Sequence, residues 1–172
     1  QMCIRDRPLT VLHQWQGICY YKKKITITPE EAKKHIWIEF EGAMHLADVW
    51  INGKHVMQHA GGYTPFVVDA TGLLKTDKEN ELLVRLDNRN NSLIPPGKPL
   101  ETLDFCYYGG IYRNVHLIAK ADVHITHPIL DGHPAGAGIF ITYPKVSQEL
   151  SVVDAKTEIK NTSDKEKVVE LR

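Results

Sequence analysis

The segment between positions 103 and 115 groups the residue types best suited to binding a ligand, and reads Leu-Asp-Phe-Cys-Tyr-Tyr-Gly-Gly-Ile-Tyr-Arg-Asn-Val. Tyrosine rings offer flat apolar faces to a sugar ring, and a carboxylate such as Asp104 accepts hydrogen bonds from sugar hydroxyls. Sugar binding is therefore one interpretation of the segment. The pattern alone favours a structural interpretation, in which Phe105, Tyr107 and Tyr112 belong to the core and Asp104 caps a turn.

Other kinds of chemistry find little support in the sequence. It has no Gly-x-Ser-x-Gly elbow, no phosphate-binding loop and no Gly-x-Gly-x-x-Gly before a helix. Acidic pairs such as Glu39 and Glu41 are interpreted as the wet face of a strand. His55 and His59 have a spacing that suits a metal only on a helix, whereas this segment is predicted to be a strand. The pattern alone predicts neither a catalytic constellation nor a metal centre.

Composition excludes several further classes. The 172 residues carry 21 Lys and Arg against 21 Asp and Glu, which argues against a nucleic-acid binder or a polybasic membrane-surface protein. No stretch approaches the roughly 20 apolar residues of a membrane span. The three cysteines, Cys3, Cys19 and Cys106, form no Cys-x-x-Cys pair, so we expect neither a disulfide framework nor a zinc site. Nothing indicates a cellular compartment.

Alternation of apolar and polar residues is the dominant pattern along the chain, and it is typical of strands with one buried face. Asn52-Gly53, between two alternating runs, predicts a hairpin with a type I′ turn. Thr28 is expected to cap a single helical turn at 29–32. Short strands and frequent turns predict an antiparallel sandwich or jelly roll. The predicted strands are 20–28, 35–41, 47–51, 54–57, 63–69, 81–86 and 115–119.

Residues 88–102 form a long, turn-rich loop between two strands, which we interpret as ordered and functional. A second change of pattern follows near residue 128. Residues 131–138 are typical of a linker or long turn, and three strands are predicted after it, at 139–143, 150–160 and 167–171.

Three strands do not close a sandwich, so we expect one complete sandwich followed by the start of another that the chain interrupts. Residues 1–7 fit neither a strand nor a signal peptide and are interpreted as a foreign leader. The predicted domains are therefore 8–126 and 127–172.

Four motifs, in order, resemble the N-terminal sugar-binding domain of family 2 glycoside hydrolases over roughly residues 13–125. Residues 104–110 are most similar to the β-galactosidase branch, and the chain from about 129 resembles the start of the immunoglobulin-like domain that follows in these enzymes. The four motifs are Ala-Asp-Val-Trp-Ile-Asn-Gly-Lys at 47–54, the Gly-Gly-Tyr-Thr-Pro-Phe run with its continuation at 61–74, Asn-Glu-Leu-Leu-Val-Arg-Leu-Asp-Asn at 80–88, and Gly-Ile-Tyr-Arg-Asn-Val at 110–115.

The resemblance implies an all-β chain, a galactose-binding-domain-like jelly-roll sandwich followed by a partial immunoglobulin-like β-sandwich. It also implies a neighbouring TIM barrel that holds the two glutamates of a retaining glycosidase acting on terminal β-galactosides. Those glutamates would lie outside this chain, which would be inactive alone. The implied partners are a β-galactoside or related sugar and the barrel, with no nucleic acid or membrane; a homo-oligomeric parent stays open.

The resemblance also assigns site residues. In β-galactosidases an acid six positions before the Gly of the Gly-Ile-[Phe/Tyr]-Arg motif contacts the sugar at the −1 subsite, directly or through a bound sodium ion, and Asp104 holds that position. Tyr107, Tyr108 and Asn88 complete the predicted substrate-binding set. No cofactor is expected within this chain, while sodium or magnesium in the full-length enzyme stays open. Arg113 is interpreted as part of a buried or half-buried ion pair.

Two other functions compete with this one. A freestanding carbohydrate-binding module would bind galactosides through Tyr107, Tyr108 or the 88–102 loop. A purely structural β-sandwich would mediate domain docking or oligomerisation and would expose a large apolar patch.

Overall fold

The computed structural model describes residues 15–103, 105, 107–133 and 137–170, so the interpretation of residues 1–7 lies outside it. The described chain is almost entirely β-structure, with two single-turn 3-10 helices, η2 (Glu31–Lys33) and η3 (Leu100–Thr102). The predicted all-β class is confirmed. The structure divides into two compact units, the first ending at Ile118 and the second beginning at Ala119, whereas the sequence predicted a boundary after residue 126. Neither short helical turn could cross a membrane, and the described residues contain no longer helix.

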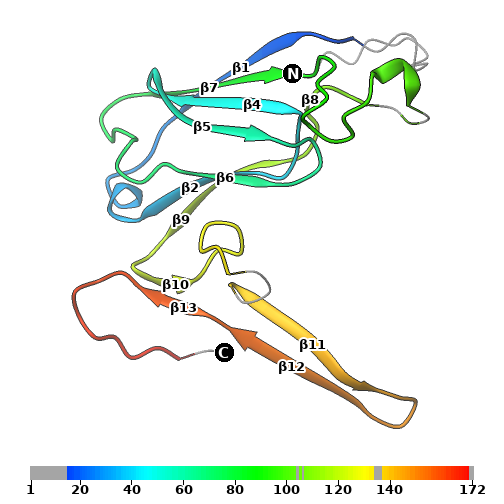
Figure 1. Cartoon of the computed structure of the whole chain (residues 1–172). Coiled ribbons are helices and arrows are strands. Elements are labelled where there is room, and N and C mark those ends of the chain that lie inside the picture. The colour runs from blue at the N-terminus through cyan, green and yellow to red at the C-terminus, as the bar shows by residue number, and fades with distance from the viewer. Residues whose placement is uncertain (1–14, 104, 106, 134–136, 171–172) are drawn as a thin grey trace. The chain divides into compact units, whose positions relative to one another are not determined.

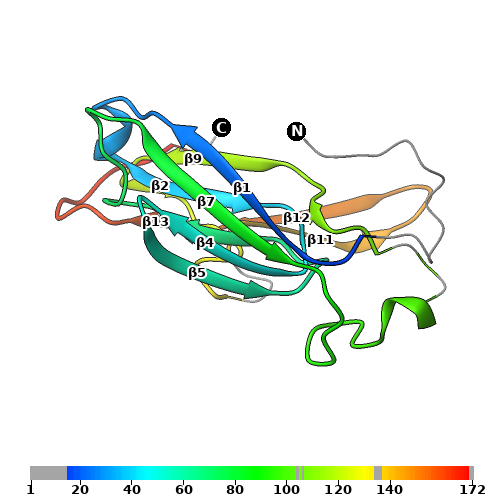
Figure 2. The same ribbon diagram turned by 90° about the horizontal axis from the view of Figure 1, so that it is seen from above.

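The first unit is a sandwich of two sheets (Figures 1 and 2). The larger sheet has the order β1-β7-β4-β5, with all neighbours antiparallel, and the smaller has the order β6-β2-β9. A short antiparallel pair, β3 with β8, joins the residues before β4 to the Gly-Ile-Tyr-Arg motif. The strands are β1 (Ile18–Ile25), β2 (His35–Phe40), β3 (Ala43–Met44), β4 (Leu46–Ile51), β5 (Lys54–Ala60), β6 (Phe66–Asp69), β7 (Asn80–Asp87), β8 (Gly110–Ile111) and β9 (Val115–Lys120).

Alternate residues of these strands fill the core, as the sequence pattern predicted. The rings of Phe40 and Phe66, both from the smaller sheet, stack with centroids 4.6 Å apart. Burying each large apolar side chain stabilises the fold by about 1.5–3 kcal/mol, so this layer is the main source of stability. Other members of the core are Ile36, Ile38, Ala47, Val49, Ile51, Val68, Leu82, Val84 and Leu86. The strand predicted at 115–119 is present as β9, but Val115 and Leu117 are 39% and 42% exposed.

One predicted local structure is confirmed and a second is confirmed in part. Asn52 and Gly53 have φ angles of 51° and 80°, both positive, as the type I′ turn between β4 and β5 requires. The predicted helical turn is present as η2, but its N-cap residue is Glu30 and not Thr28. The Thr28 hydroxyl nevertheless accepts a hydrogen bond from the Glu31 backbone N–H at 3.2 Å. The Glu31 carboxylate accepts one from the Thr28 N–H at 2.7 Å in return. Such reciprocal capping depends on residues three apart, which is why a sequence reveals it.

Asn80, at the start of β7, is a fully buried polar hub. Its Oδ1 accepts hydrogen bonds from the Lys75 N–H at 2.7 Å and from Asn52 Nδ2 at 2.9 Å. Its Nδ2 donates to the Lys75 carbonyl at 2.8 Å. One side chain therefore fixes both the loop before β7 and the β4–β5 turn.

We expect Asn80→Ala to lower the free energy of unfolding by about 2–4 kcal/mol, because it removes several hydrogen bonds at once and leaves partly buried backbone groups of Lys75 without this partner. Urea unfolding followed by tryptophan fluorescence measures this. Glu79→Gln, an exposed neighbouring change, is the control and should stay within about 0.5 kcal/mol. A loss below about 1 kcal/mol for Asn80→Ala would contradict the hub role.

The second unit consists of two strand pairs. β10 (Val123–Ile125) pairs with β13 (Ile159–Asn161), and β11 (Ile139–Val146) pairs with β12 (Ser151–Thr157), all antiparallel. The predicted strand at 150–160 divides into β12 and β13. The predicted strand at 167–171 is wrong, because residues 162–170 contain no strand. Alternation is not sufficient there, since a strand also needs a hydrogen-bonded neighbour.

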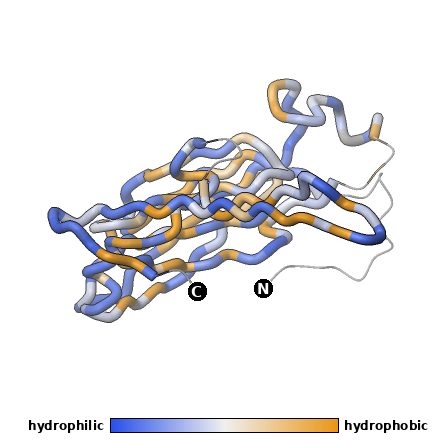
Figure 3. The backbone as a smooth tube through the Cα atoms, turned by 90° about the horizontal axis from the view of Figure 1, so that it is seen from below, coloured by the Kyte–Doolittle hydropathy of each residue, from blue (hydrophilic) through white to orange (hydrophobic). Residues whose placement is uncertain are grey.

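Apolar side chains of the β11–β12 hairpin are mostly exposed, including Ile139, Ile141, Tyr143, Val146 and Val153. Apolar segments therefore recur on the strands of both units (Figure 3), but only the first unit buries them in an extensive core. Few buried contacts give a segment low local stability.

Amide hydrogens of β11 and β12 should accordingly exchange with solvent much faster than those of the central strands β4 and β7. Hydrogen–deuterium exchange read by mass spectrometry measures both sets in one sample. Equal protection of the hairpin and the central strands would contradict this expectation.

Candidate functional site

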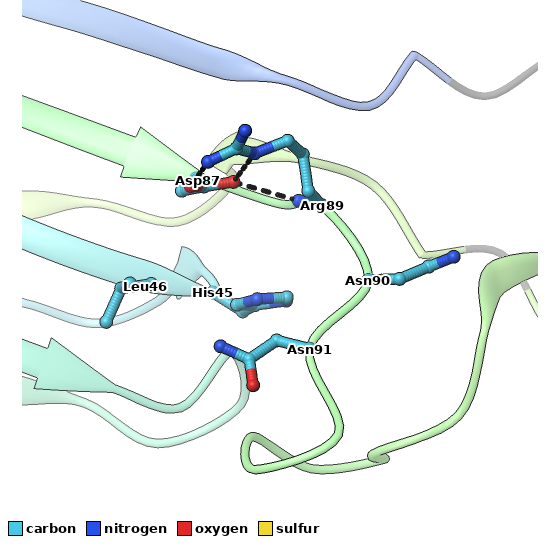
Figure 4. A pocket seen from close by; sticks show the side chains of 6 residues that line it. All are labelled: His45, Leu46, Asp87, Arg89, Asn90 and Asn91. Atoms are coloured by element: carbon cyan, nitrogen blue, oxygen red, sulfur yellow. Dashed lines mark hydrogen bonds and ion pairs between the residues drawn. The ribbon is translucent and has the colours of Figure 1, made fainter.

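A pocket of about 290 Å³ lies where β4 begins and β7 ends (Figure 4). The register of the two strands places Leu46, the first residue of β4, opposite Asp87, the last of β7. The chain then enters the long 88–102 loop, whose first residues complete the lining. The lining residues are His45, Leu46, Asp87, Arg89, Asn90 and Asn91.

Asp87 and Arg89 form a charged pair at the pocket wall (Figure 4). Oδ2 of Asp87 accepts from Arg89 Nη2 at 2.6 Å, and Oδ1 accepts from Arg89 Nε at 2.9 Å, a two-point contact that is typical of strong arginine–carboxylate pairs. The hydrogen bond from Arg89 is the main reason that the pKa of Asp87 is lowered. Arg85 continues the row with 3.0 Å to Asp48 and 3.4 Å to Asp87. Two acids and two arginines therefore balance each other beside the pocket.

His45, between β3 and β4, is the most deeply buried polar residue of the lining, with 2% exposure. Its Nδ1 lies 2.5 Å from the Tyr107 hydroxyl, and the two rings are 5.5 Å apart. Burial lowers the pKa of His45, so the imidazole is neutral at neutral pH.

Tyr107 is 5% exposed and belongs to a small apolar cluster with Met44 and Leu103. Its hydroxyl also lies 3.4 Å from the Pro95 carbonyl, and burial raises its pKa to about 12, which keeps the phenol protonated. The structure thus places this predicted sugar-binding tyrosine against His45, with little of its ring facing solvent.

The other predicted site residues have different surroundings. Tyr108 is 48% exposed. Asn88 is buried: its Oδ1 accepts from the Gly17 N–H at 2.8 Å and its Nδ2 donates to the Trp15 carbonyl at 2.9 Å. A Cβ on Gly109 would lie 2.3 Å from Asn88 Nδ2, so glycine is needed where the motif packs against the loop. Asp104, the first predicted site residue, lies outside the described residues.

The interpretation of Arg113 as part of a buried or half-buried ion pair is wrong. Its side chain is exposed, and its guanidinium lies over the Tyr112 ring, 5.8 Å from the centroid. No ion pair joins Arg113 to any other described residue. In this cation–π contact the guanidinium of Arg113 stays in contact with water on the side away from the ring. Arg113 therefore avoids the loss of hydration that burial in an ion pair would require.

Among the described residues no group of three His, Cys, Asp or Glu could hold a metal ion. His55 lies 3.2 Å from Asp48, whereas the His59 ring stacks on Phe66 at 4.5 Å. The expected sodium ligand, Asp104, lies outside the described part of the chain.

Sequence reasoning missed His45, Asp87, Arg89 and Asn91 as pocket residues. The polar residues directly after β7 could have been identified, because they begin a long loop that was predicted to be functional. His45 could not, since no sequence pattern marks a single histidine between the apolar Met44 and Leu46.

An antiparallel two-sheet sandwich with a polar pocket at its strand ends places the chain among all-β sandwich domains. The family model described as "Glycosyl hydrolases family 2, sugar binding domain" matches residues 8–121. The chain belongs to glycosyl hydrolase family 2, and the resemblance of its motifs is confirmed.

The similar proteins are named for two activities, beta-glucuronidase and beta-galactosidase. A beta-glucuronidase of Bacteroides fragilis is 35% identical over 150 residues, which are 85% of this chain and 20% of that protein. A beta-galactosidase of Thermoanaerobacter pseudethanolicus is 36% identical over 151 residues, which are 86% of this chain and 20% of that protein. The crystal structure of a Bacteroides uniformis beta-glucuronidase is similar with a TM-score of 0.72 and 34% identity, covering 87% of this chain and 17% of that one. The chain therefore spans about a fifth of the length of these relatives.

The buried, neutral His45 makes stability depend on pH in a defined direction. Because its folded pKa is lowered, the unfolded chain binds more protons below about pH 6.5, so acidification favours unfolding. We expect the free energy of unfolding to fall more steeply between about pH 7.5 and 5.5 in the wild type than in His45→Gln.

Urea unfolding at the two pH values measures this difference. His133→Gln, a change at an exposed histidine of the second unit, serves as the control and should keep the wild-type slope. A His45→Gln slope equal to or steeper than the wild-type slope would contradict the account.

Proposed function

We propose that this chain is the N-terminal, non-catalytic part of a retaining glycoside hydrolase that acts on terminal β-galactosides. The match of the family's sugar-binding domain to residues 8–121, in a chain that spans about a fifth of its relatives, carries this proposal. Retaining glycosidases use two carboxyl groups about 5 Å apart, and we assign both to a barrel domain elsewhere in the longer protein.

Within this proposal, Asp104 is the residue of this chain that accepts hydrogen bonds from the sugar in the −1 subsite. The surroundings of its sequence neighbours support such a role. Leu103 and Tyr107 are both buried and pack in one cluster, so the chain is anchored on either side of position 104. A preorganised acceptor needs anchors of this kind.

The choice of galactoside rests on the similarity of residues 104–110 to the β-galactosidase branch. Relatives named beta-glucuronidase match as well as those named beta-galactosidase, so β-glucuronides are the rival substrate class. The two sugars differ at one group, a carboxylate against a hydroxymethyl, and a direct assay separates them.

A second, compatible role is packing against the barrel. Val115 and Leu117 expose apolar surface on β9, the edge of the order β6-β2-β9, and such surface favours contact with another protein surface.

The test compares this chain with the longer protein that contains it, using nitrophenyl β-galactoside and nitrophenyl β-glucuronide. We expect no turnover by the chain alone and hydrolysis of the galactoside by the longer protein. Asp104→Asn in the longer protein should lower kcat/KM by about 10- to 100-fold, because a hydrogen bond to a charged group contributes about 1.5–3 kcal/mol.

Glu101→Gln makes the same acid-to-amide change at an exposed position nearby and should leave kcat/KM unchanged. Turnover by the chain alone, or hydrolysis of the glucuronide in place of the galactoside, would overturn the proposal.

A further inference from the structure

We propose that Asn52, in the turn between β4 and β5, is a deamidation site that the native hydrogen bonds of the first unit protect, and that its conversion to an acid is irreversible. The substrate is the side-chain amide of Asn52, and the co-reactant is water. The proposal is independent of the proposed function, because it concerns the chemistry of this turn alone.

The Asn52-Gly53 turn places a side-chain amide beside an unhindered backbone nitrogen. In deamidation the Gly53 nitrogen attacks Cγ of Asn52, its proton passes through water to Nδ2, the Cγ–Nδ2 bond breaks and ammonia leaves. Water then opens the resulting succinimide ring at either carbonyl and gives aspartate or isoaspartate. A Cβ built on Gly53 would meet no atom of a described residue within 4 Å, so the glycine side of the turn is open.

Three hydrogen bonds to described residues hold the Asn52 amide in the native chain. Its Oδ1 accepts from the Glu81 backbone N–H at 3.0 Å. Its Nδ2 donates to the Leu73 carbonyl at 3.1 Å and to Asn80 Oδ1 at 2.9 Å. Ring closure makes Cγ tetrahedral and releases Nδ2, so these contacts must open before the reaction proceeds. The native fold therefore slows deamidation at a turn whose sequence favours it.

Backbone partners fix the orientation of both amides in this cluster. The Glu81 N–H can only donate and the Leu73 carbonyl can only accept, so Oδ1 and Nδ2 of Asn52 cannot exchange places. In the same way, the Lys75 N–H at 2.7 Å fixes Oδ1 of Asn80, and the Lys75 carbonyl at 2.8 Å fixes Nδ2. Asn80 therefore presents an acceptor to position 52.

An acid at position 52 cannot restore these contacts. The aspartate oxygen that replaces Nδ2 would face the Leu73 carbonyl and Asn80 Oδ1, two acceptors that then have no donor from position 52. Asn80 cannot turn to offer its Nδ2, because Lys75 holds both ends of its amide. Isoaspartate would lengthen the backbone of the turn and disturb the pairing of Ile51 with Lys54. Deamidation is therefore coupled to a lasting loss of stability.

The first test measures deamidation at position 52 of the complete 172-residue chain at alkaline pH, by peptide mapping with mass spectrometry. We expect the native chain to react at least about 10-fold more slowly than the same chain in concentrated urea, because the native hydrogen bonds must open first. Equal rates in the two conditions would overturn the protection.

The second test compares two variants that circular dichroism shows to be folded. Asn80→Ala removes one acceptor of Asn52 and releases the loop that holds the other, so it should raise the native rate by about 5- to 30-fold. Leu86→Ala is the matched control, because it removes a fully buried side chain from the same strand, opposite Ala47 and away from the turn. It should change the rate by less than about 2-fold while the chain stays folded. Equal acceleration by both variants would overturn the role of Asn80.

The third test uses Asn52→Asp, which reproduces the aspartate product and does not depend on the folding of Asn80→Ala. We expect its urea unfolding midpoint, read by tryptophan fluorescence, to fall by about 1 M. Asn91→Asp is the control: Asn91 Oδ1 accepts from the Leu93 N–H at 2.9 Å, an acceptor role that aspartate keeps, so its midpoint should stay within about 0.2 M of the wild type. An unchanged midpoint for Asn52→Asp would overturn the irreversibility.

Discussion

The hydrogen bond between the Tyr107 hydroxyl and His45 Nδ1 joins segments that are 62 positions apart in the sequence. One partner lies at the junction of β3 and β4, and the other lies in the aromatic segment before the Gly-Ile-Tyr-Arg motif. Since both side chains are buried, separating them would leave Nδ1 of His45 without this partner. This bond therefore fixes the aromatic segment against the junction of β3 and β4, where the pocket lies.

The two-sheet core makes that bond possible. The stacked sheets fix the register of β4 and β7, and the register brings Leu46 opposite Asp87. His45 precedes that pair and the polar loop follows it, so the ends of two central strands become the walls of one pocket. Charged residues of β4 and β7 that point away from the core then neutralise each other in the row that includes Asp48, Arg85 and Asp87. The alternation of apolar residues thus determines the sandwich, and the ends of its strands supply the polar groups of the pocket.

Features that depend on a few neighbouring residues could be predicted from the sequence. The Asn52-Gly53 turn and the Thr28–Glu31 pair follow from local backbone preferences. The alternation at 81–86 gave the correct buried face, because Leu82, Val84 and Leu86 lie on one side of the strand. At 35–41 the predicted face is buried, but Trp37 on the opposite side is buried as well. The strand at 167–171 failed because the pattern does not reveal whether a partner strand exists.

The site was less accessible to such reasoning. Asn88 and Tyr107 were selected by their types, yet their side chains are engaged by the backbone of residues 15 and 17 and by His45 respectively. His45 is recognised as a site residue only through its contact with Tyr107, which forms in the folded chain and which no local sequence pattern encodes. Arg113 was assigned to an ion pair by its charge, whereas its actual neighbour is the ring of Tyr112.

In the folded chain, burial keeps His45 neutral and bonded to Tyr107. Long-range nitrogen–proton correlation NMR of the histidine rings reports both the charge and the tautomer of His45 directly. We expect a neutral imidazole at neutral pH, because burial lowers the pKa of His45, and we expect Tyr107→Phe to shift the ring signals of His45. A charged imidazole at neutral pH, or ring signals that Tyr107→Phe leaves unchanged, would contradict this state of His45.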